Sequence, residues 1–180
     1  MNIFVLDRDP KIAACEMCDK HVVKMIVESA QMLSTCHRML DGAPEKRPSV
    51  SGKRQVTYYK LDDWREKHLY KAVHYKHPCN IWLRENVSNY LWLYTHFLAL
   101  LAEYRLRYNK EHACEKLIDP LASVPNNINN GSLTEFPQAM PDECKTDNVV
   151  EAYRSYYKKY KGAFATWKVR DTPSWFAKAS

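Results

Sequence analysis

Large apolar residues recur at helical spacing in the second half of the chain, and this pattern constrains the fold more than any other feature. Between positions 88 and 108 they stand three or four residues apart: Leu91, Tyr94, Leu98, Leu101, Tyr104 and Tyr108. Such spacing places side chains on one side of an α-helix. The pattern therefore predicts a long helix at the centre of a helical core.

Signals for the starts and ends of helices divide the rest of the chain. Asp9-Pro10 is typical of a helix start and Asp41-Gly42 of a helix end. The expected helices lie near 10–40, 61–75, 80–109 and 147–162, and the first leaves room for an interruption at Cys18-Asp19. The other expected segments are a short extended stretch at 2–6, a polar loop at 42–53 and a long irregular loop at 119–146. A chain of 180 residues with these elements predicts one compact all-α domain of about four helices, covering 1–180.

Positive charge is concentrated in the last fifth of the chain. The net charge is +6, and residues 145–180 carry eight Lys/Arg against three Asp/Glu. Aromatic residues alternate with the cations in 147–180, which we expect to be a basic aromatic helix and tail. Cations neutralise phosphates and aromatic rings stack on bases, so this composition predicts DNA binding, although a solvated basic helix would look the same. The predicted DNA contacts are Arg154, Lys158, Lys159, Lys161, Trp167 and Lys168, with Lys53 and Arg54 in the polar loop.

The sequence lacks the motifs of several common enzyme classes. It contains no phosphate-loop lysine motif, dinucleotide fingerprint, nucleophile elbow or HExxH, which disfavours nucleotide-driven motors, Rossmann dehydrogenases and common hydrolases. No apolar run approaches the roughly 18–20 residues of a membrane span, and the N-terminus does not resemble a secretory signal. We therefore expect no membrane partner, no small-molecule cofactor and a cytoplasmic location, the host cytoplasm if a phage encodes the chain.

His21, Lys24 and Glu28 form a polar strip along the first expected helix, at the border of its apolar side. A carboxylate at that border can act as an acid or a base, so Glu28 is the candidate for this role. Lys24 supplies a charge or, once desolvated, an amine nucleophile, and His21 orients the site or binds phosphate. An ordinary solvated helix face would show the same strip. The apolar side, which we expect to be buried, includes Cys18, Met25, Met32 and Cys36.

Cysteine and histidine spacing also raises the question of a metal site. Cys15-x-x-Cys18-x-x-His21 has the spacing of metal ligands on a helix, and His74-x-x-His77-x-Cys79 would complete a zinc site. However, Cys18 belongs to the apolar side of its helix, so burial explains it without a metal. Zinc therefore stays an alternative, and we predict no metal ligands.

Several stretches of the chain resemble known proteins. MNIFVLDRDP, CDKHVVKMIVESAQMLSTCHRMLDG, HPCNIWLRENVSNYLWLY and AMPDEC are similar to a group of small tailed-phage proteins, a resemblance that covers nearly the whole chain and implies no activity. More distantly, Asp19-Lys20-His21 followed by Glu28 resembles the first helix of phage pyrimidine-dimer DNA glycosylases of the endonuclease V type. Those are small all-α enzymes with a catalytic glutamate seven residues after a histidine.

The second resemblance implies that Glu28 and His21 belong to a catalytic site, and that the tyrosine- and lysine-rich residues 153–168 bind DNA. In that family the nucleophile is a free α-amino group exposed by methionine removal. Here Asn2 should leave Met1 in place, and Met1 stands several residues further from the helix.

Three functions remain open at this level. The first is a DNA glycosylase with AP-lyase activity on a modified or damaged base, with Lys24 or the Met1 amine as the nucleophile. The second is a non-enzymatic phage protein that binds nucleic acid or redirects host machinery. The third is a small zinc-stabilised module that binds another protein.

Overall fold

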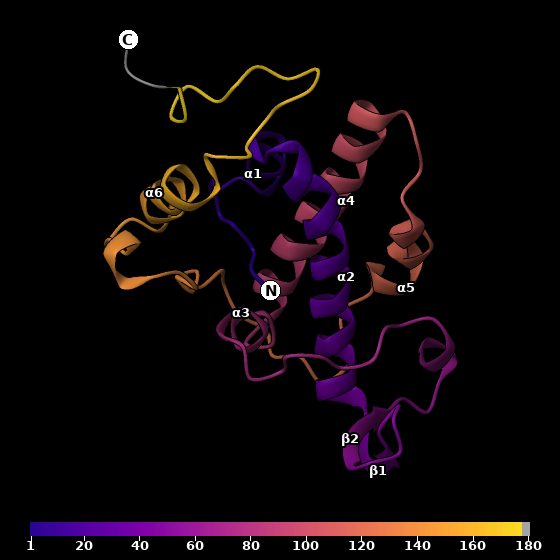
Figure 1. Ribbon diagram of the computed structural model, residues 1–180. Coiled ribbons are helices and arrows are strands. Elements are labelled where there is room, and N and C mark those ends of the chain that lie inside the picture. The colour runs from indigo at the N-terminus through magenta and orange to yellow at the C-terminus, as the bar shows by residue number, and fades with distance from the viewer. Residues whose placement is uncertain (178–180) are drawn as a thin grey trace.

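The computed structural model describes residues 1–177, and Figure 1 shows a predominantly helical molecule with one two-stranded antiparallel sheet. Its helices are α1 (Pro10–Glu16), α2 (Asp19–Asp41), α3 (Pro78–Leu83), α4 (Val87–Tyr108), α5 (Ile118–Ala122) and α6 (Val149–Lys161). Its strands are β1 (Ala43–Pro48) and β2 (Gln55–Lys60), and 3₁₀ turns lie at Trp64–Lys67, Ala113–Leu117 and Asp142–Cys144. The expectation of a mostly helical chain is confirmed, whereas the strictly all-α class is wrong. The last three residues of the predicted 147–180 region lie outside the described part.

The first expected helix consists of two helices separated at the place where the sequence left room for an interruption. The carboxylate of Asp9 begins α1 by accepting hydrogen bonds from two main-chain N–H groups. The backbone becomes extended at Met17, and Cys18 is the N-cap of α2. The N–H of Cys18 donates to the hydroxyl of Tyr157, 2.9 Å away, so this turn is tied to α6.

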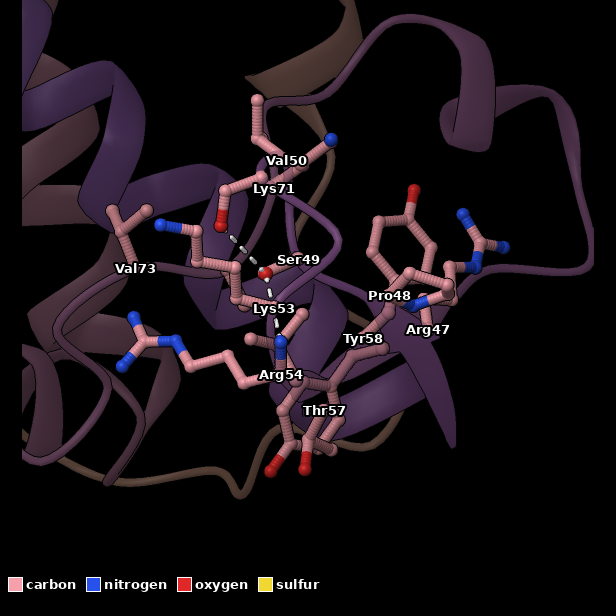
Figure 2. A pocket seen from close by; sticks show the side chains of 14 residues that line it. Arg47, Pro48, Ser49, Val50, Lys53, Arg54, Thr57, Tyr58, Lys71 and Val73 are labelled. Carbon is pink, nitrogen blue, oxygen red and sulfur yellow. Dashed lines mark hydrogen bonds between the residues drawn. The ribbon is translucent and has the colours of Figure 1, made fainter.

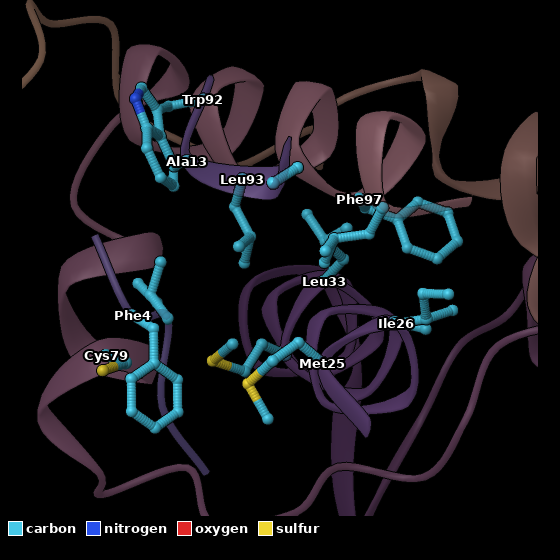
Figure 3. Close-up of a cluster of buried hydrophobic side chains, with 14 of the residues drawn as sticks. Phe4, Ala13, Met25, Ile26, Leu33, Cys79, Trp92, Leu93 and Phe97 are labelled. Atoms are coloured by element: carbon cyan, nitrogen blue, oxygen red, sulfur yellow. The ribbon is translucent and has the colours of Figure 1, made fainter. Parts of the chain in front are cut away.

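Helices α2 and α4 pack together at the centre of the molecule. Figure 3 shows Met25, Ile26 and Leu33 of α2 facing Leu93 and Phe97 of α4. The predicted apolar side of α2 is confirmed, since its buried residues include Cys18, Met25, Met32 and Cys36.

The predicted helix at 80–109 differs from the structure in two ways. It is divided into α3 and α4 at 84–86, where the side chain of Asn86 caps α4 by accepting from the N–H of Asn89. The buried side of α4 also differs, because Tyr90 and Leu93 are buried whereas Leu91 is 44% exposed. Large apolar residues surround much of α4, so their spacing alone did not identify the side that packs.

No helix forms at 61–75, and that prediction is wrong. The buried guanidinium of Arg38 donates to four main-chain oxygens of the neighbouring segments, those of Tyr59, Glu66, Leu69 and Tyr70. These carbonyls point at one side chain instead of along a helix axis. Only the short 3₁₀ turn at Trp64–Lys67 is helical, and the chain then continues without regular structure to α3, with a turn at 75–76.

The expected polar loop at 42–53 is part of a β-hairpin. Strand β2 contains Val56, Thr57 and two tyrosines, residue types that favour strands, and it pairs with β1 from Ala43↔Lys60 to Pro48↔Gln55. The connecting turn includes Gly52 at φ 71°, a left-handed conformation that glycine adopts without strain. The hairpin extends beyond the C-terminal end of α2, at the bottom of Figure 1.

In the C-terminal third of the chain, the structure agrees better with the elements predicted from the sequence. Residues 119–146 are largely irregular, apart from the end of α5 and one 3₁₀ turn, and α6 lies within the predicted 147–162. Helix α6 buries Val149, Ala152, Tyr153 and Tyr157 against the domain. Among residues 1–177, no helix combines the length and apolar character needed to cross a membrane.

Candidate active site

The N-terminal segment runs through the core and places its end against α2. Ile3, Val5 and Leu6 are buried, as the sequence predicted for 2–6, but the segment is not fully extended, since Phe4 has a φ of 54° and its oxygen accepts from the N–H of Leu6 at 2.8 Å. The segment places Met1 beside Glu28, in the third turn of α2. The N-terminus therefore reaches this helix in spite of the number of residues between them.

The carboxylate of Glu28 contacts the N-terminal end of the chain. The α-amino nitrogen of Met1 lies 3.5 Å from Oε2 of Glu28. The main-chain N–H of Asn2 donates to the same oxygen at 2.9 Å. The Glu28 side chain is only 13% exposed, so these interactions take place at the edge of the core. Two successive backbone nitrogens thus converge on one carboxylate.

Lys24 occupies the other side of the same carboxylate. Its Nζ lies 3.4 Å from Oε1 of Glu28, one helical turn away, while its side chain is 65% exposed. The structure therefore brings together Lys24 and Glu28 from the predicted strip, and adds Met1 to them. Because Lys24 is well solvated, its amine lacks the desolvation that activates a lysine nucleophile.

Asn80 on α3 holds the first residue in place. Its Nδ2 donates to Sδ of Met1 at 3.1 Å and to the main-chain oxygens of Val73 and His74. Within residues 1–177 its Oδ1 has no hydrogen-bond partner, although the side chain is buried. Asn2 adds a second anchor, since its Nδ2 donates to the oxygen of Ala139 at 2.8 Å. The position of the N-terminal amine is thus fixed from two directions.

His74 and His77 lie in the electrostatic field of this site. Burial lowers the pKa of His77, the positive charges of the N-terminal amine and His74 lower it further, and Glu28 acts in the opposite direction. Nδ1 of His77 accepts from the N–H of Cys79 and begins α3. The sequence grouped these histidines only as candidate zinc ligands; their position beside an amine and a carboxylate was not predicted.

His21 lies apart from the carboxylate, in a cluster of aromatic rings. Its ring centroid is 4.5 Å from that of Phe4 and 5.0 Å from that of Tyr157, with Phe164 on another side. Burial lowers the pKa of His21 to about 4, and the charges of Lys161 and Lys24 act in the same direction. The catalytic role predicted for His21 is untested; its contacts are those of a neutral ring that holds Phe4.

The predicted DNA contacts on α6 occupy different surroundings. Arg154 donates to the oxygen of Leu6 and forms ion pairs with Glu16 and Asp7, so its charge is already matched. Lys158 lies in an exposed hollow on α6, and Lys159 stands 3.9 Å from Glu143.

Three further cations and rings border the aromatic cluster. Nζ of Lys161 lies 4.8 Å from the ring centre of Tyr156 and 6.0 Å from that of Phe4, on the same side as the N-terminal segment. The indole N–H of Trp167 donates to the oxygen of Glu16, and the side chain of Lys168 reaches over the ring of Tyr108. Trp167 and Lys168 thus cover the turn between α1 and α2, and their predicted DNA contacts are untested.

Lys53 and Arg54 lie on the β-hairpin, where both side chains are exposed. They line a pocket that Figure 2 shows from close by, and the pocket extends to residues 71–73. The sequence placed these cations in a loop, and they do lie in the turn that connects β1 and β2, where the N–H of Ser49 donates to the main-chain oxygen of Arg54 at 2.7 Å.

The six candidate zinc ligands do not form one site. Sγ of Cys15 donates to Glu103, 3.2 Å away, Cys18 is buried at the start of α2, and Cys79 is buried on α3. Among residues 1–177, no three His, Cys, Asp or Glu side chains stand close enough to hold a metal ion.

The comparison with protein families identifies the chain. The model of the pyrimidine dimer DNA glycosylase family matches residues 1–116, which include the N-terminal segment, α2 with Glu28, and α3. The chain belongs to this family. No curated protein and no solved structure matches it significantly.

Proposed function

We propose that this protein is a DNA glycosylase that removes a damaged pyrimidine and cleaves the DNA at the resulting abasic site. The observation that carries the proposal is the convergence of the Met1 amine and Glu28, 3.5 Å apart and held by Asn80. Membership of the pyrimidine dimer DNA glycosylase family supports the choice of DNA and of a pyrimidine lesion.

An amine beside a carboxylate suits this chemistry. The unprotonated amine attacks C1′ of the deoxyribose; the N–C1′ bond forms, and the base leaves with the electrons of the glycosidic bond. Loss of the amine proton and opening of the sugar ring then give a Schiff base. Glu28 accepts a proton from C2′, and the electrons released there break the C3′–O bond and expel the phosphate. Addition of water to the imine returns the free amine.

The same carboxylate serves the amine in either form of the N-terminus. If the chain keeps Met1, its amine lies 3.5 Å from Oε2 of Glu28; if Met1 is removed, the nitrogen of Asn2 already lies 2.9 Å from that oxygen. The Met1 side chain is nearly fully buried, and its sulfur accepts from Asn80. We therefore favour the retained Met1 amine as the nucleophile.

The neighbouring residues have supporting roles in this proposal. Lys24 forms an ion pair with Glu28 and, because it is exposed, contributes a cation for a DNA phosphate. His21 is a positioning residue that holds Phe4, and through it the N-terminal segment. The target base must leave the base stack of the DNA duplex to reach an amine at the edge of the protein core.

The direct test is Glu28→Gln, with Glu111→Gln as a matched control. Glu28→Gln removes the carboxylate and keeps its shape, so we expect cleavage of dimer-containing duplex to fall by about 10²-fold or more, with binding retained. Glu111 is 77% exposed and, among residues 1–177, its only ion pair is with Arg105, so its variant should match the parent. Equal cleavage by the Glu28→Gln variant and the parent would reject the proposed role. No cleavage by the parent would favour a protein that only binds DNA.

A further inference from the structure

The β-hairpin and the segment 71–73 enclose a pocket of about 770 Å³. Among the described residues, four cations line it, namely Arg47, Lys53, Arg54 and Lys71, and no Asp or Glu belongs to its lining. Its apolar lining includes half-buried Val56, Tyr59 and Val73. Figure 2 shows Lys53 and Arg54 extending from the hairpin toward Val73. A pocket with this lining favours a ligand that is anionic at one end and apolar at the other.

Three of these cations are available to such a ligand. Arg47 pairs with Glu45 and lies over the ring of Tyr58, with 3.5 Å between its guanidinium carbon and the ring centre. Lys53, Arg54 and Lys71 are exposed, and none of them forms an ion pair within the described residues. Unmatched cations that converge on one hollow concentrate positive potential there.

The pocket is anchored to α2. Arg38 donates to the oxygen of Tyr59 and to Glu66, and the hydroxyl of Tyr58 donates to the same Glu66 carboxylate at 2.6 Å. At the other end of the strands, the main-chain N–H of Ser49 donates to the oxygen of Arg54 at 2.7 Å. Strand pairing, the Arg38 contacts and the Ser49–Arg54 hydrogen bond therefore hold the backbone of the hairpin in position before any ligand arrives.

A hydrogen bond also links the wall of the pocket to the candidate active site. Val73 lines the pocket, and its main-chain oxygen accepts from Nδ2 of Asn80, the same amide that donates to Met1. One side chain thus contacts both the pocket wall and the first residue. A DNA strand with its reacting sugar at the N-terminal amine would pass next to the pocket.

We propose that the hairpin pocket holds the sugar–phosphate backbone of the substrate DNA, next to the reacting nucleotide. Phosphate oxygens bind Lys53, Arg54 and Lys71, and the apolar face of a deoxyribose packs on Val56, Tyr59 and Val73. The inference rests on the proposed function for the identity of the DNA substrate. It assigns the hairpin the task of fixing register along the duplex, since backbone contacts carry position and no sequence information.

The test compares the triple variant Lys53→Ala/Arg54→Ala/Lys71→Ala with Lys11→Ala/Lys110→Ala/Lys116→Ala, which removes three exposed cations from elsewhere. Ethylation interference on a duplex with one abasic site locates the phosphates that each protein needs, and a salt series on an undamaged duplex counts the phosphates that it neutralises. With the pocket variant, interference should disappear at two or three consecutive phosphates on one side of the abasic site. Its plot of log affinity against log salt should flatten by about 0.9 for each phosphate that the variant no longer neutralises.

A second variant, Ser51→Glu, places a carboxylate in the exposed turn of the pocket without touching the core. It should weaken binding and abolish interference at the same phosphates. A pocket variant with the interference pattern and salt slope of the parent would overturn the inference, as would equal effects of the control triple variant. Borohydride trapping by the parent protein tests the proposed function separately, because the salt dependence of binding to undamaged DNA needs no reaction.

Discussion

At the scale of single residues, the structure divides the polar strip of α2 into two environments. Glu28 and Lys24 meet the N-terminal amine, while His21 turns into the aromatic cluster around Phe4. Helical spacing predicted that all three share one side of a helix. It carried no information on what covers each of them, because the covering residues come from the N-terminal segment and from α6.

His21 should make the stability of the protein depend on pH. Its pKa is lowered to about 4, so between about pH 6.5 and 4 the unfolded chain binds a proton that the folded chain does not. The free energy of unfolding should therefore fall as pH falls through this window, by about 3 kcal/mol at most for this residue. His21→Phe removes that contribution and also the unpartnered Nδ1, so urea unfolding should show a shallower pH dependence.

The control for this experiment is His68→Phe, at an exposed position. Buried His37 and His96, whose pKa values are also lowered to about 4, keep their share of the pH dependence in every variant. A His21→Phe protein with the pH dependence of the parent would show that His21 is solvated and not packed as described.

At the scale of elements, Arg38 links α2, the hairpin and the segment that leads to α3. It is 1% exposed and donates to Glu66 and four main-chain oxygens. Burial raises the pKa of Glu66, but hydrogen bonds from Tyr58, from the N–H of Leu61 and from Arg38 lower it to about 2. Arg38→Met removes the cation that pairs with Glu66 and leaves several carbonyls without their donor. We expect the free energy of unfolding to drop by about 3 kcal/mol or more.

Arg105→Met is the matched control, because Arg105 is 58% exposed and its pairs lie on the surface. It should change the free energy of unfolding by less than about 1 kcal/mol. Similar destabilisation of the two variants, measured by chemical denaturation, would contradict the role given to Arg38.

The same residue explains why part of the fold could not be predicted. Cap residues and apolar spacing predicted the regions of α1, α2, α4 and α6, because their signals are local. The non-helical path that follows Trp64–Lys67 depends on a guanidinium more than twenty residues earlier in the chain. The positions of Asn80 and His77 beside Met1 follow from that path, so the sequence indicated Glu28, Lys24 and the Met1 amine but not Asn80 and His77.

At the scale of the whole molecule, positive charge lies on both sides of the candidate active site. Lys161 stands beside Phe4, and Lys158 lies on the outer part of α6. Lys53 and Arg54 occupy the hairpin, at the far end of α2 (Figure 1). This distribution suits a duplex that extends in both directions from the reacting nucleotide.

Lys158→Ala/Lys161→Ala should weaken DNA binding similarly on unrelated sequences. The plot of log affinity against log salt should flatten by roughly two units if each lysine neutralises one phosphate. Arg154 is left unchanged because ion pairs already match its charge. Fluorescence anisotropy of labelled duplexes across a salt series gives both values. Affinity that does not respond to salt, or a variant that binds as tightly as the parent, would refute phosphate binding by α6.

The central claim is that the N-terminal amine beside Glu28 is the nucleophile, and borohydride trapping on DNA with an abasic site tests it most directly. The first tryptic peptide, residues 1–8, contains no lysine, so DNA attached to it can only be on the α-amino group. Mass spectrometry should find the adduct on this peptide, in the parent and in Lys24→Ala alike. An adduct on the peptide that contains Lys24, or no adduct with the parent protein, would contradict the account.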